Sequence, residues 1–330
     1  MSGASGEDRF IARFLRPIAG SPGALGLLDD AALLTPPEGM DLVLTKDALV
    51  AGVHFFPDDP PEAIARKALR VNLSDLAAKG ALPLGILLAL ALPKALAAGW
   101  MEAFAAGLGT DCADFACPLL GGDTVATPGP VVLSVTAFGA VPKGGFVPRT
   151  GARPGQAIVV SGTIGDAALG LALRTTPDAP GFRHLDAAAR AHLLDRYLHP
   201  RPRVALAPVL RAHAAAAMDI SDGLAGDLAK MLDASGCGGR IAAERVPLSA
   251  AVRAAIAADP ALLRTALTGG DDYEILACVS QERAEAFIAD AAAAGVPAAV
   301  LGATCAKKGL VVEGADGAPL DLGRGAFSHF

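Results

Sequence analysis

Short apolar runs of strand length alternate along the chain with longer segments in which apolar residues recur at helical spacing. The run 84–92 is apolar throughout and bounded by prolines, which is typical of a buried strand. Within 61–82, Ile64, Ala68 and Val71 recur at near-helical spacing. Because such segments alternate to the C-terminus, the sequence predicts an α/β fold, or a mixed α+β one.

The same patterns predict the remaining elements. Further strands are expected at 41–44, 118–120, 131–141, 157–161, 273–279, 298–303 and 310–312. Further helices are expected at 100–112, 166–173, 205–217, 221–234, 250–258 and 283–294, and 174–184 is expected to be a loop.

A segment rich in Pro, Gly and Arg, 147–155, interrupts this pattern. The chain has 330 residues, more than a single typical domain. We therefore expect one domain at residues 1–147 and a second at 148–330.

Composition excludes several classes of protein. The chain is 52% hydrophobic, but much of this is alanine, and no apolar stretch reaches the roughly 20 residues of a membrane-spanning helix. Acids and arginines near the N-terminus do not resemble a secretory signal. The five cysteines are odd in number and lack C-x-x-C spacing, which favours reduced thiols. A net charge of −6 and a single Trp disfavour nucleic acid as a partner. We expect a cytoplasmic protein that binds neither membranes nor nucleic acid.

Aspartates cluster at the ends of apolar segments, several of them beside Gly, Ser or Thr. We expect them in turns after strands, where carboxylates are well placed for hard cations such as Mg²⁺. The motifs are Asp29-Asp30, Thr45-Lys46-Asp47, Asn72-Leu73-Ser74-Asp75, Gly121-Gly122-Asp123, Asp219-Ile220-Ser221-Asp222 and Asp271-Asp272.

Each motif has a simpler structural reading, because Asp, Gly and Ser are common turn and cap residues. The segment Ser161–Asp166 is the best candidate for a phosphate-binding loop, but it reads equally well as a tight turn between a strand and a helix. Alone, His54 reads as a structural histidine and Arg149 as a surface residue. As a functional residue, Arg149 would clamp phosphate.

Read in order, the motifs resemble the thiamine-monophosphate kinase family, within the superfamily of aminoimidazole-ribonucleotide-synthetase-like enzymes. The resemblance covers the chain from about Gly26 to its last residue. It rests on LLDDAAL, TKDALVAGVHF, KALRVNLSDLAAKGA, LLGGDT, RTGARPGQ, VVSGTIGDAALGLAL, MDISDGLAGDL, TGGDDYEI and AFSHF.

The resemblance implies a homodimer in which each N-terminal domain contributes strands to a shared barrel and a larger α/β domain packs outside it. ATP would lie in a cleft near the dimer interface with several Mg²⁺ ions. The implied reaction transfers phosphate directly from ATP to thiamine monophosphate, giving ADP and thiamine diphosphate.

Residues carry over from the family only where this sequence matches its motifs. Those matching metal-binding positions are Asp30, Thr45, Lys46, Asp47, Asp75, Asp123, Asp219 and Asp222. Those matching ATP contacts are Gly122, Asp123, Arg149 and Ser221, and those matching substrate contacts are His54, Asp271 and Phe327. Among these we expect Asp75, Asp123 and Arg149 to be catalytic.

Four positions depart from the family pattern. Leu28 replaces a Gly, and Lys46 replaces a Thr, so a metal contact there would use its backbone carbonyl. Asp271 replaces a Glu, and Phe327 replaces a Trp or Tyr while keeping an aromatic face for stacking.

Three alternatives remain open. Aminoimidazole ribonucleotide synthetase belongs to the same superfamily, as does selenophosphate synthetase. The latter would carry a reactive cysteine near its N-terminus, whereas the first cysteine here is Cys112. The third alternative is a protein that binds nucleotide or thiamine phosphates without turnover.

Overall fold

The computed structural model describes residues 6–323, which divide into two compact units. Unit 1 comprises the described residues up to Leu76 together with Ala81–Gly144. Unit 2 comprises Ala77–Gly80 and the described residues from Gly145 onward. The domain boundary expected between residues 147 and 148 stays a prediction. No helix in the described part of the chain is long and apolar enough to cross a membrane.

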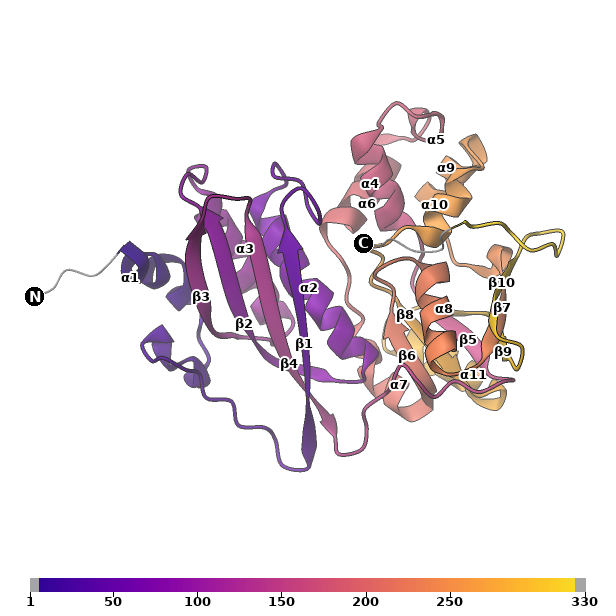
Figure 1. The fold of residues 1–330 in the computed structure, drawn as a ribbon, viewed down its shortest axis with the longest axis horizontal. Coiled ribbons are helices and arrows are strands. Elements are labelled where there is room, and N and C mark those ends of the chain that lie inside the picture. The colour runs from indigo at the N-terminus through magenta and orange to yellow at the C-terminus, as the bar shows by residue number, and fades with distance from the viewer. Residues whose placement is uncertain (1–5, 324–330) are drawn as a thin grey trace, which may run out of the picture. The chain divides into compact units, whose positions relative to one another are not determined.

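Unit 1 is built on a four-stranded sheet of order β1-β4-β2-β3. β4 pairs antiparallel with β1 and β2, and β2 pairs parallel with β3, so β1 and β3 form opposite edges. The helices α2 and α3 cover one face of the sheet (Figure 1). The bounds are β1 Met40–Val50, α2 Pro61–Ala78, β2 Leu82–Pro93, α3 Trp100–Asp114, β3 Leu119–Thr127 and β4 Val132–Pro142.

The two faces of this sheet differ in polarity and cover. On β1, Val43 and Leu49 are buried, whereas Leu42 and Leu44 are 42% and 59% exposed. Successive side chains of a strand point to opposite faces, so odd-numbered residues of β1 face the helices and even-numbered ones face the open side. The second face therefore carries large apolar side chains that the described chain covers only in part.

The N-terminal segment consists of short helical pieces. α1 (Gly6–Phe10) continues into the turns Ile11–Leu15 and Arg16–Ile18, and a further turn spans Pro22–Leu27. Three side chains of this segment are buried: Leu15, Ala19 and Ala24.

Unit 2 is built on a six-stranded sheet of order β10-β7-β9-β5-β8-β6. β10 and β7 pair parallel, and every other neighbouring pair is antiparallel. The strands are β5 Ala157–Ser161, β6 Ala214–Asp219, β7 Gly238–Ala242, β8 Ile275–Val279, β9 Ala298–Cys305 and β10 Gly309–Glu313.

Apolar clusters form on both faces of this sheet because β5 and β8 are buried along their whole length. One cluster contains α8, and the other contains α7 and α11. A third joins α4, α5, α6, α9 and α10. The helices are α4 Asp166–Thr175, α5 Pro180–Arg183, α6 Ala187–Leu198, α7 Ala207–His213, α8 Leu224–Ala234, α9 Ala250–Ala258, α10 Leu262–Thr268 and α11 Ala284–Ala293.

All five thiols are free, and four of them are buried: Cys112 and Cys117 in unit 1, and Cys237 and Cys278 in unit 2. Burial raises the pKa of Cys112 and of Cys278 to about 12. It also raises the pKa of Cys117 and Cys237. At neutral pH these four side chains are therefore uncharged and pack as small apolar residues.

The mixed α/β class and most expected elements are confirmed, but the single helix expected at 205–217 is wrong. α7 ends at His213, and the alanines that follow form β6, which pairs with β8. Alanine favours helices in isolation, yet its small side chain also fits a buried strand, and pairing within the sheet decides between the two.

Two further expectations need correction. Thr45, Lys46 and Asp47 lie within β1, Gly121–Asp123 lies within β3, and the motif from Asn72 to Asp75 lies within α2, so these motifs are not in turns after strands. β1 and β3 are edge strands with one partly open face, where polar side chains are tolerated. The expected loop 174–184 contains the short helix α5.

Candidate active site

Four polar residues of unit 1 meet where β1 passes α2. Thr45 donates its hydroxyl to the carboxylate of Asp75, and the backbone N–H of Asp47 donates to Asn72 Oδ1 at 3.1 Å. Asn72 Nδ2 donates to the carbonyl of Ala68 at 3.0 Å, which fixes the orientation of the amide. Residues three apart on a helix share a face, so Asn72 and Asp75 both reach β1.

Two neighbouring carboxylates, one of them largely buried, make this place suitable for a cation. Burial, and then the charge of Asp75, raise the pKa of Asp47 to about 6. A divalent cation between the two carboxylates would remove that repulsion, and carboxylate and hydroxyl oxygens are the ligands that Mg²⁺ prefers. The donor set Thr45, Asp47 and Asp75 therefore fits magnesium.

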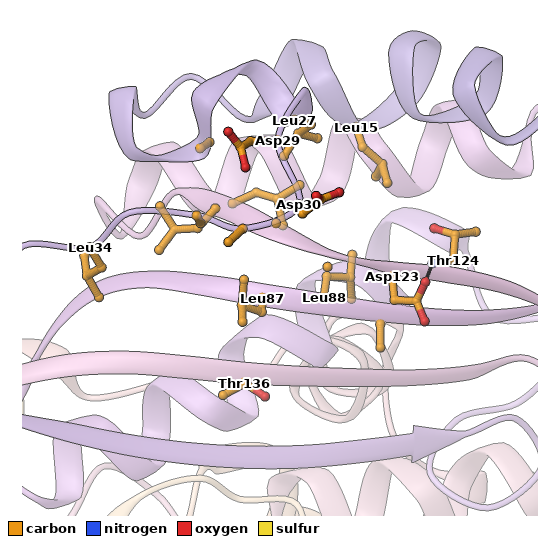
Figure 2. Close-up of a pocket in the computed structure, with 18 of the residues that line it drawn as sticks. Leu15, Leu27, Asp29, Asp30, Leu34, Leu87, Leu88, Asp123, Thr124 and Thr136 are labelled. Carbon is orange, nitrogen blue, oxygen red and sulfur yellow. Dashed lines mark hydrogen bonds between the residues drawn. The ribbon is translucent and has the colours of Figure 1, made fainter. Parts of the chain in front are cut away.

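A cavity of about 850 Å³ is lined by the N-terminal segment and by the open face of the sheet. Asp29 and Asp30 line it from the N-terminal segment, and Lys46 and Asp123 line it from β1 and β3. Figure 2 shows Asp30 and Asp123 along the same cavity, with Leu87 and Leu88 on the strand between the N-terminal segment and β4. Its volume and its mixture of apolar and acidic groups are typical of a small-molecule site.

The structure separates the predicted acidic residues of unit 1 into two groups. Asp123 pairs with Ala89, which lines the cavity, so its side chain lies on the open face, opposite the face of Thr45 and Asp47. β1 and β3 are also opposite edges of the sheet, three strand spacings or about 14 Å apart. One chain alone therefore does not bring Asp123 to Asp75.

Two predicted residues of unit 1 also have roles in the fold. Gly122 lies so close to β2 that a Cβ atom would be 1.8 Å from the carbonyl oxygen of Leu88. His54 follows β1, and the backbone N–H of Val50 donates to its Nδ1 at 3.0 Å. Because Nδ1 accepts, the neutral ring carries its proton on Nε2.

In unit 2, the loop after β6 lies against the loop before β8. The N–H of Asp271 donates to the carbonyl of Ser221 at 2.9 Å, and the N–H of Tyr273 donates to that of Ile220 at 2.8 Å. A Cβ atom on Gly270 would lie 2.2 Å from the Ser221 carbonyl oxygen. The expected ATP contact Ser221 and the expected substrate contact Asp271 thus belong to one pair of loops.

Two residues that were not predicted as site residues organise the first of these loops, the one after β6. Asp227, buried in the first turn of α8, accepts the N–H groups of Ser221 and Asp222 at 3.0 and 2.8 Å. Lys230 donates to Asp222 and to Asp227. The sequence signal for Asp227 is an Asp in the first turn of a helix that follows a Gly, where the helix dipole favours a negative charge. Asp219, at the end of β6, is 8% exposed.

Arg149 lies near the other end of α8. Ser235, at the C-terminal end of that helix, accepts the N–H groups of Gly151 and Ala152 at 3.2 Å each. At 1.5 Å per residue, the length of α8 separates Ser235, and with it the Arg149 segment, from Ser221 by about 16 Å. Unit 2 alone therefore does not bring the exposed Arg149 into contact with Ser221.

The candidate phosphate loop Ser161–Asp166 is already occupied by a carboxyl group of the protein itself. Gly165 N–H, at the start of α4, donates to both carboxylate oxygens of Asp272 at 2.9 Å. Burial raises the pKa of Asp272 well above its usual range, although these hydrogen bonds oppose the rise. The segment is thus a tight turn stabilised by the protein's own carboxyl group.

Within residues 6–323, no three His, Cys, Asp or Glu side chains lie close enough together to hold a metal ion. Mg²⁺ sites that also engage substrate phosphates commonly use only one or two carboxylates, so pairs such as Asp47 and Asp75 remain suitable. Phe327 lies outside the described residues.

Comparison with known proteins identifies the family. Residues 28–141 match the family model of the AIR synthase related protein, N-terminal domain. Residues 153–315 match the model of the AIR synthase related protein, C-terminal domain. The thiamine-monophosphate kinase of Caulobacter vibrioides is 46% identical over 325 residues, which cover 96% of this chain and 90% of that protein. The chain belongs to the thiamine-monophosphate kinase family.

Solved structures of this kinase family share the fold. The crystal structure of thiamine-monophosphate kinase from Stenotrophomonas maltophilia has a TM-score of 0.83 and 38% identity, over 97% of this chain and 98% of that one. AaThiL complexed with AMPPCP and TMP has a TM-score of 0.78 and 31% identity, over 90% of this chain and 89% of that one. The two-domain fold expected from the motifs is therefore confirmed.

Proposed function

We propose that this chain is an ATP-dependent kinase that phosphorylates thiamine monophosphate to thiamine diphosphate by direct, in-line transfer. The observation that carries the proposal is the match, over nearly the full length, to thiamine-monophosphate kinases, one of which is described as complexed with AMPPCP and TMP. The acceptor phosphate is already ionised near neutral pH, so positioning and charge neutralisation are the main requirements.

The chain's own residues supply those requirements. We assign Gly122, Asp123, Arg149 and Ser221 to ATP, and His54, Asp271 and Phe327 to thiamine monophosphate. Arg149 would pair with phosphate oxygens through its planar guanidinium. The paired loops of unit 2 support the assignment, because Ser221 and Asp271 are held together by a main-chain hydrogen bond.

Several Mg²⁺ ions would offset the negative charge of the phosphates when bound. We propose that Asp47, Asp75 and Thr45 hold one ion at the place where burial, and then the charge of Asp75, raise the pKa of Asp47. The other ligands that we propose, some by their backbone, are Asp30, Lys46, Asp123, Asp219 and Asp222. Among these, Asp30, Lys46 and Asp123 line one cavity.

We also propose that the active form is a homodimer whose unit 1 sheets face each other in a shared barrel. The apolar open face of the sheet, with Leu42 and Leu44 exposed, supports this arrangement. The free thiols favour the reducing cytoplasm as its location.

A coupled assay of ADP release tests the activity. Thiamine monophosphate, free thiamine and aminoimidazole precursors are offered separately with ATP, and only thiamine monophosphate is expected to support turnover. A chelator should abolish the signal and added Mg²⁺ should restore it. Turnover with an aminoimidazole precursor would favour the synthetase alternative. Tight binding without any ADP release would favour a binding protein.

A further inference from the structure

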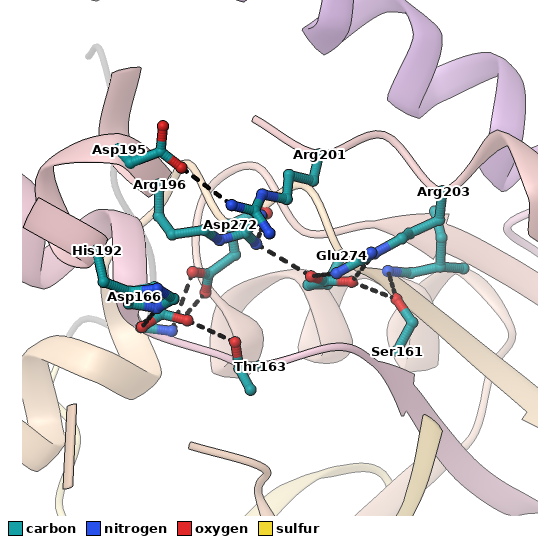
Figure 3. A network of polar contacts seen from close by, with 12 residues as sticks. Ser161, Thr163, Asp166, His192, Asp195, Arg196, Arg201, Arg203, Asp272 and Glu274 are labelled. Atoms are coloured by element: carbon teal, nitrogen blue, oxygen red, sulfur yellow. Dashed lines mark hydrogen bonds and ion pairs between the residues drawn. The ribbon is translucent and has the colours of Figure 1, made fainter. Parts of the chain in front are cut away.

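A charge cluster around Asp272 and Glu274, which follow Asp271 in the chain, has no role in the proposed reaction (Figure 3). At its centre is Glu274, whose side chain is completely buried. Three donors surround this carboxylate: Arg203 through Nε at 2.6 Å and through Nη2, Arg196 Nη2 at 3.0 Å, and Ser161 Oγ at 2.6 Å. The positive charges of two arginines thus balance the negative charge of one carboxylate, and both oxygens of that carboxylate accept hydrogen bonds.

The backbone is built to admit this carboxylate. A Cβ atom on Gly162 would lie 2.1 Å from a Glu274 carboxylate oxygen, so only glycine leaves the space. Ser161 Oγ also accepts the N–H of Ile275 at 2.8 Å, which ties β5 to the start of β8. The position of Glu274 is therefore fixed by its side chain and by the strand that follows it.

The three residues before Glu274 depend on that fixed point. Asp271 and Tyr273 have φ values of +71° and +51°, in the left-handed region that side chains other than glycine rarely adopt. Such backbone is retained only where the surrounding structure enforces it, and it is common at functional sites. Asp272, between them, is held by Gly165 N–H.

We propose that Arg203 and Arg196 are positioning residues that act through Glu274 to hold Asp271 in its strained conformation against thiamine monophosphate. This inference rests on the proposed role of Asp271. The Ser221 loop has a second anchor in Asp227, so loosening Glu274 disturbs the thiamine monophosphate contact more than the ATP contact.

A purely structural charge cluster would behave differently. Removing one partner of a buried ion pair lowers stability, which reduces the amount of folded enzyme and affects both substrates equally. A positioning role raises KM for one substrate in the molecules that remain folded. Comparing the change in KM for thiamine monophosphate with the change in KM for ATP therefore distinguishes a positioning role from a purely structural one.

The test uses Arg203→Met, because Arg196 still neutralises Glu274 in that variant. Its matched control is Arg201→Met, two residues away, where the guanidinium pairs with the partly exposed Asp195. Asp271→Asn serves as the reference for the substrate contact. KM for thiamine monophosphate and for ATP, kcat and Tm are measured for each full-length variant.

For Arg203→Met we expect KM for thiamine monophosphate to rise about tenfold, the scale of a misplaced contact, with KM for ATP changed less than about twofold. Arg201→Met should leave both unchanged, and Arg203→Lys should recover only part of the loss because lysine lacks the planar fork. Equal changes for both substrates, or a lowered Tm alone, would overturn the positioning role. If Asp271→Asn leaves KM for thiamine monophosphate unchanged, the substrate assignment itself fails. If Asp271→Asn raises that KM and Arg203→Met does not, only the positioning role of Arg203 fails.

Discussion

Asp75 is the residue on which the proposed chemistry of unit 1 most depends, because it faces both the Thr45 hydroxyl and Asp47. Asp75→Asn keeps an oxygen that can accept from Thr45 but removes the charge. We expect kcat to fall by at least about 100-fold, as on loss of a group that stabilises transferred charge, with Tm little changed. Near-normal ADP release would contradict the assignment.

The pKa of Asp47 predicts how stability and metal binding vary with pH. Its pKa is about 6 in the folded protein against 3.8 for the unperturbed group, so the folded state binds the extra proton between these values. Without Mg²⁺, this group's contribution to stability is greatest below about pH 4 and is lost as pH rises through about 6. Mg²⁺ binds the ionised form, so its stabilising effect should grow over the same range.

The measurement is Tm with and without Mg²⁺ at pH 5 and pH 7.5, in the native protein and in Asp47→Asn. The native protein should show the larger Mg²⁺-induced rise at pH 7.5. Asp47→Asn, which cannot ionise, should lose most of that difference between the two pH values. An undiminished difference in the variant would assign the effect to another group.

At the scale of elements, a buried ion pair joins α2 to α3. Asp111 on α3 is fully buried and accepts from Arg70 Nε at 2.5 Å and Nη2 at 2.9 Å. Asp111→Ala leaves Arg70 without its carboxylate, so we expect the free energy of unfolding to fall by about 3 kcal/mol. The control, Glu102→Ala, removes an exposed pair with Arg13 from the same helix and should cost less than about 1 kcal/mol. Denaturant unfolding measures both, and equal losses would contradict this ranking.

Element type was predictable where the sequence pattern is strong, as in the helical spacing of α2 and the continuous apolar run of β2. Prediction failed where local preference and long-range pairing disagree. The alanines of β6 favour a helix locally, but β8 offers a strand partner that no short window of sequence contains. The turn predicted at Gly121-Gly122-Asp123 was wrong for a related reason. Gly122 is required because the carbonyl of Leu88 on the neighbouring strand leaves no room for a side chain, and not because the chain turns there.

At the scale of the whole molecule, the residue types of the site were predictable from motifs, but their grouping was not. The sequence gives no sign that Asp47 and Asp123 fall on opposite faces and edges of one sheet, since that depends on strand order. Asp227 and Lys230 were not predicted as site residues, because their role is to bind the Ser221 loop through hydrogen bonds that only the fold creates.

The dimer hypothesis gives a direct test at this scale. Leu44 is 59% exposed on the open face of the unit 1 sheet. Leu44→Glu would place a charge in the proposed interface, so we expect the mass from light scattering to drop from dimer to monomer and kinase activity to fall with it. The control Leu171→Glu, at a 42% exposed leucine of α4 in unit 2, should stay dimeric. A monomeric native protein would contradict the hypothesis.

The distribution of the cysteines has a practical consequence. Each unit contains two buried thiols, and an alkylating reagent can modify them only when the surrounding structure opens. Pulse labelling with iodoacetamide, read out by peptide mass spectrometry, would therefore time the unfolding of each half of the chain separately. No engineered label is needed, because each unit already contains two buried native cysteines that report its opening.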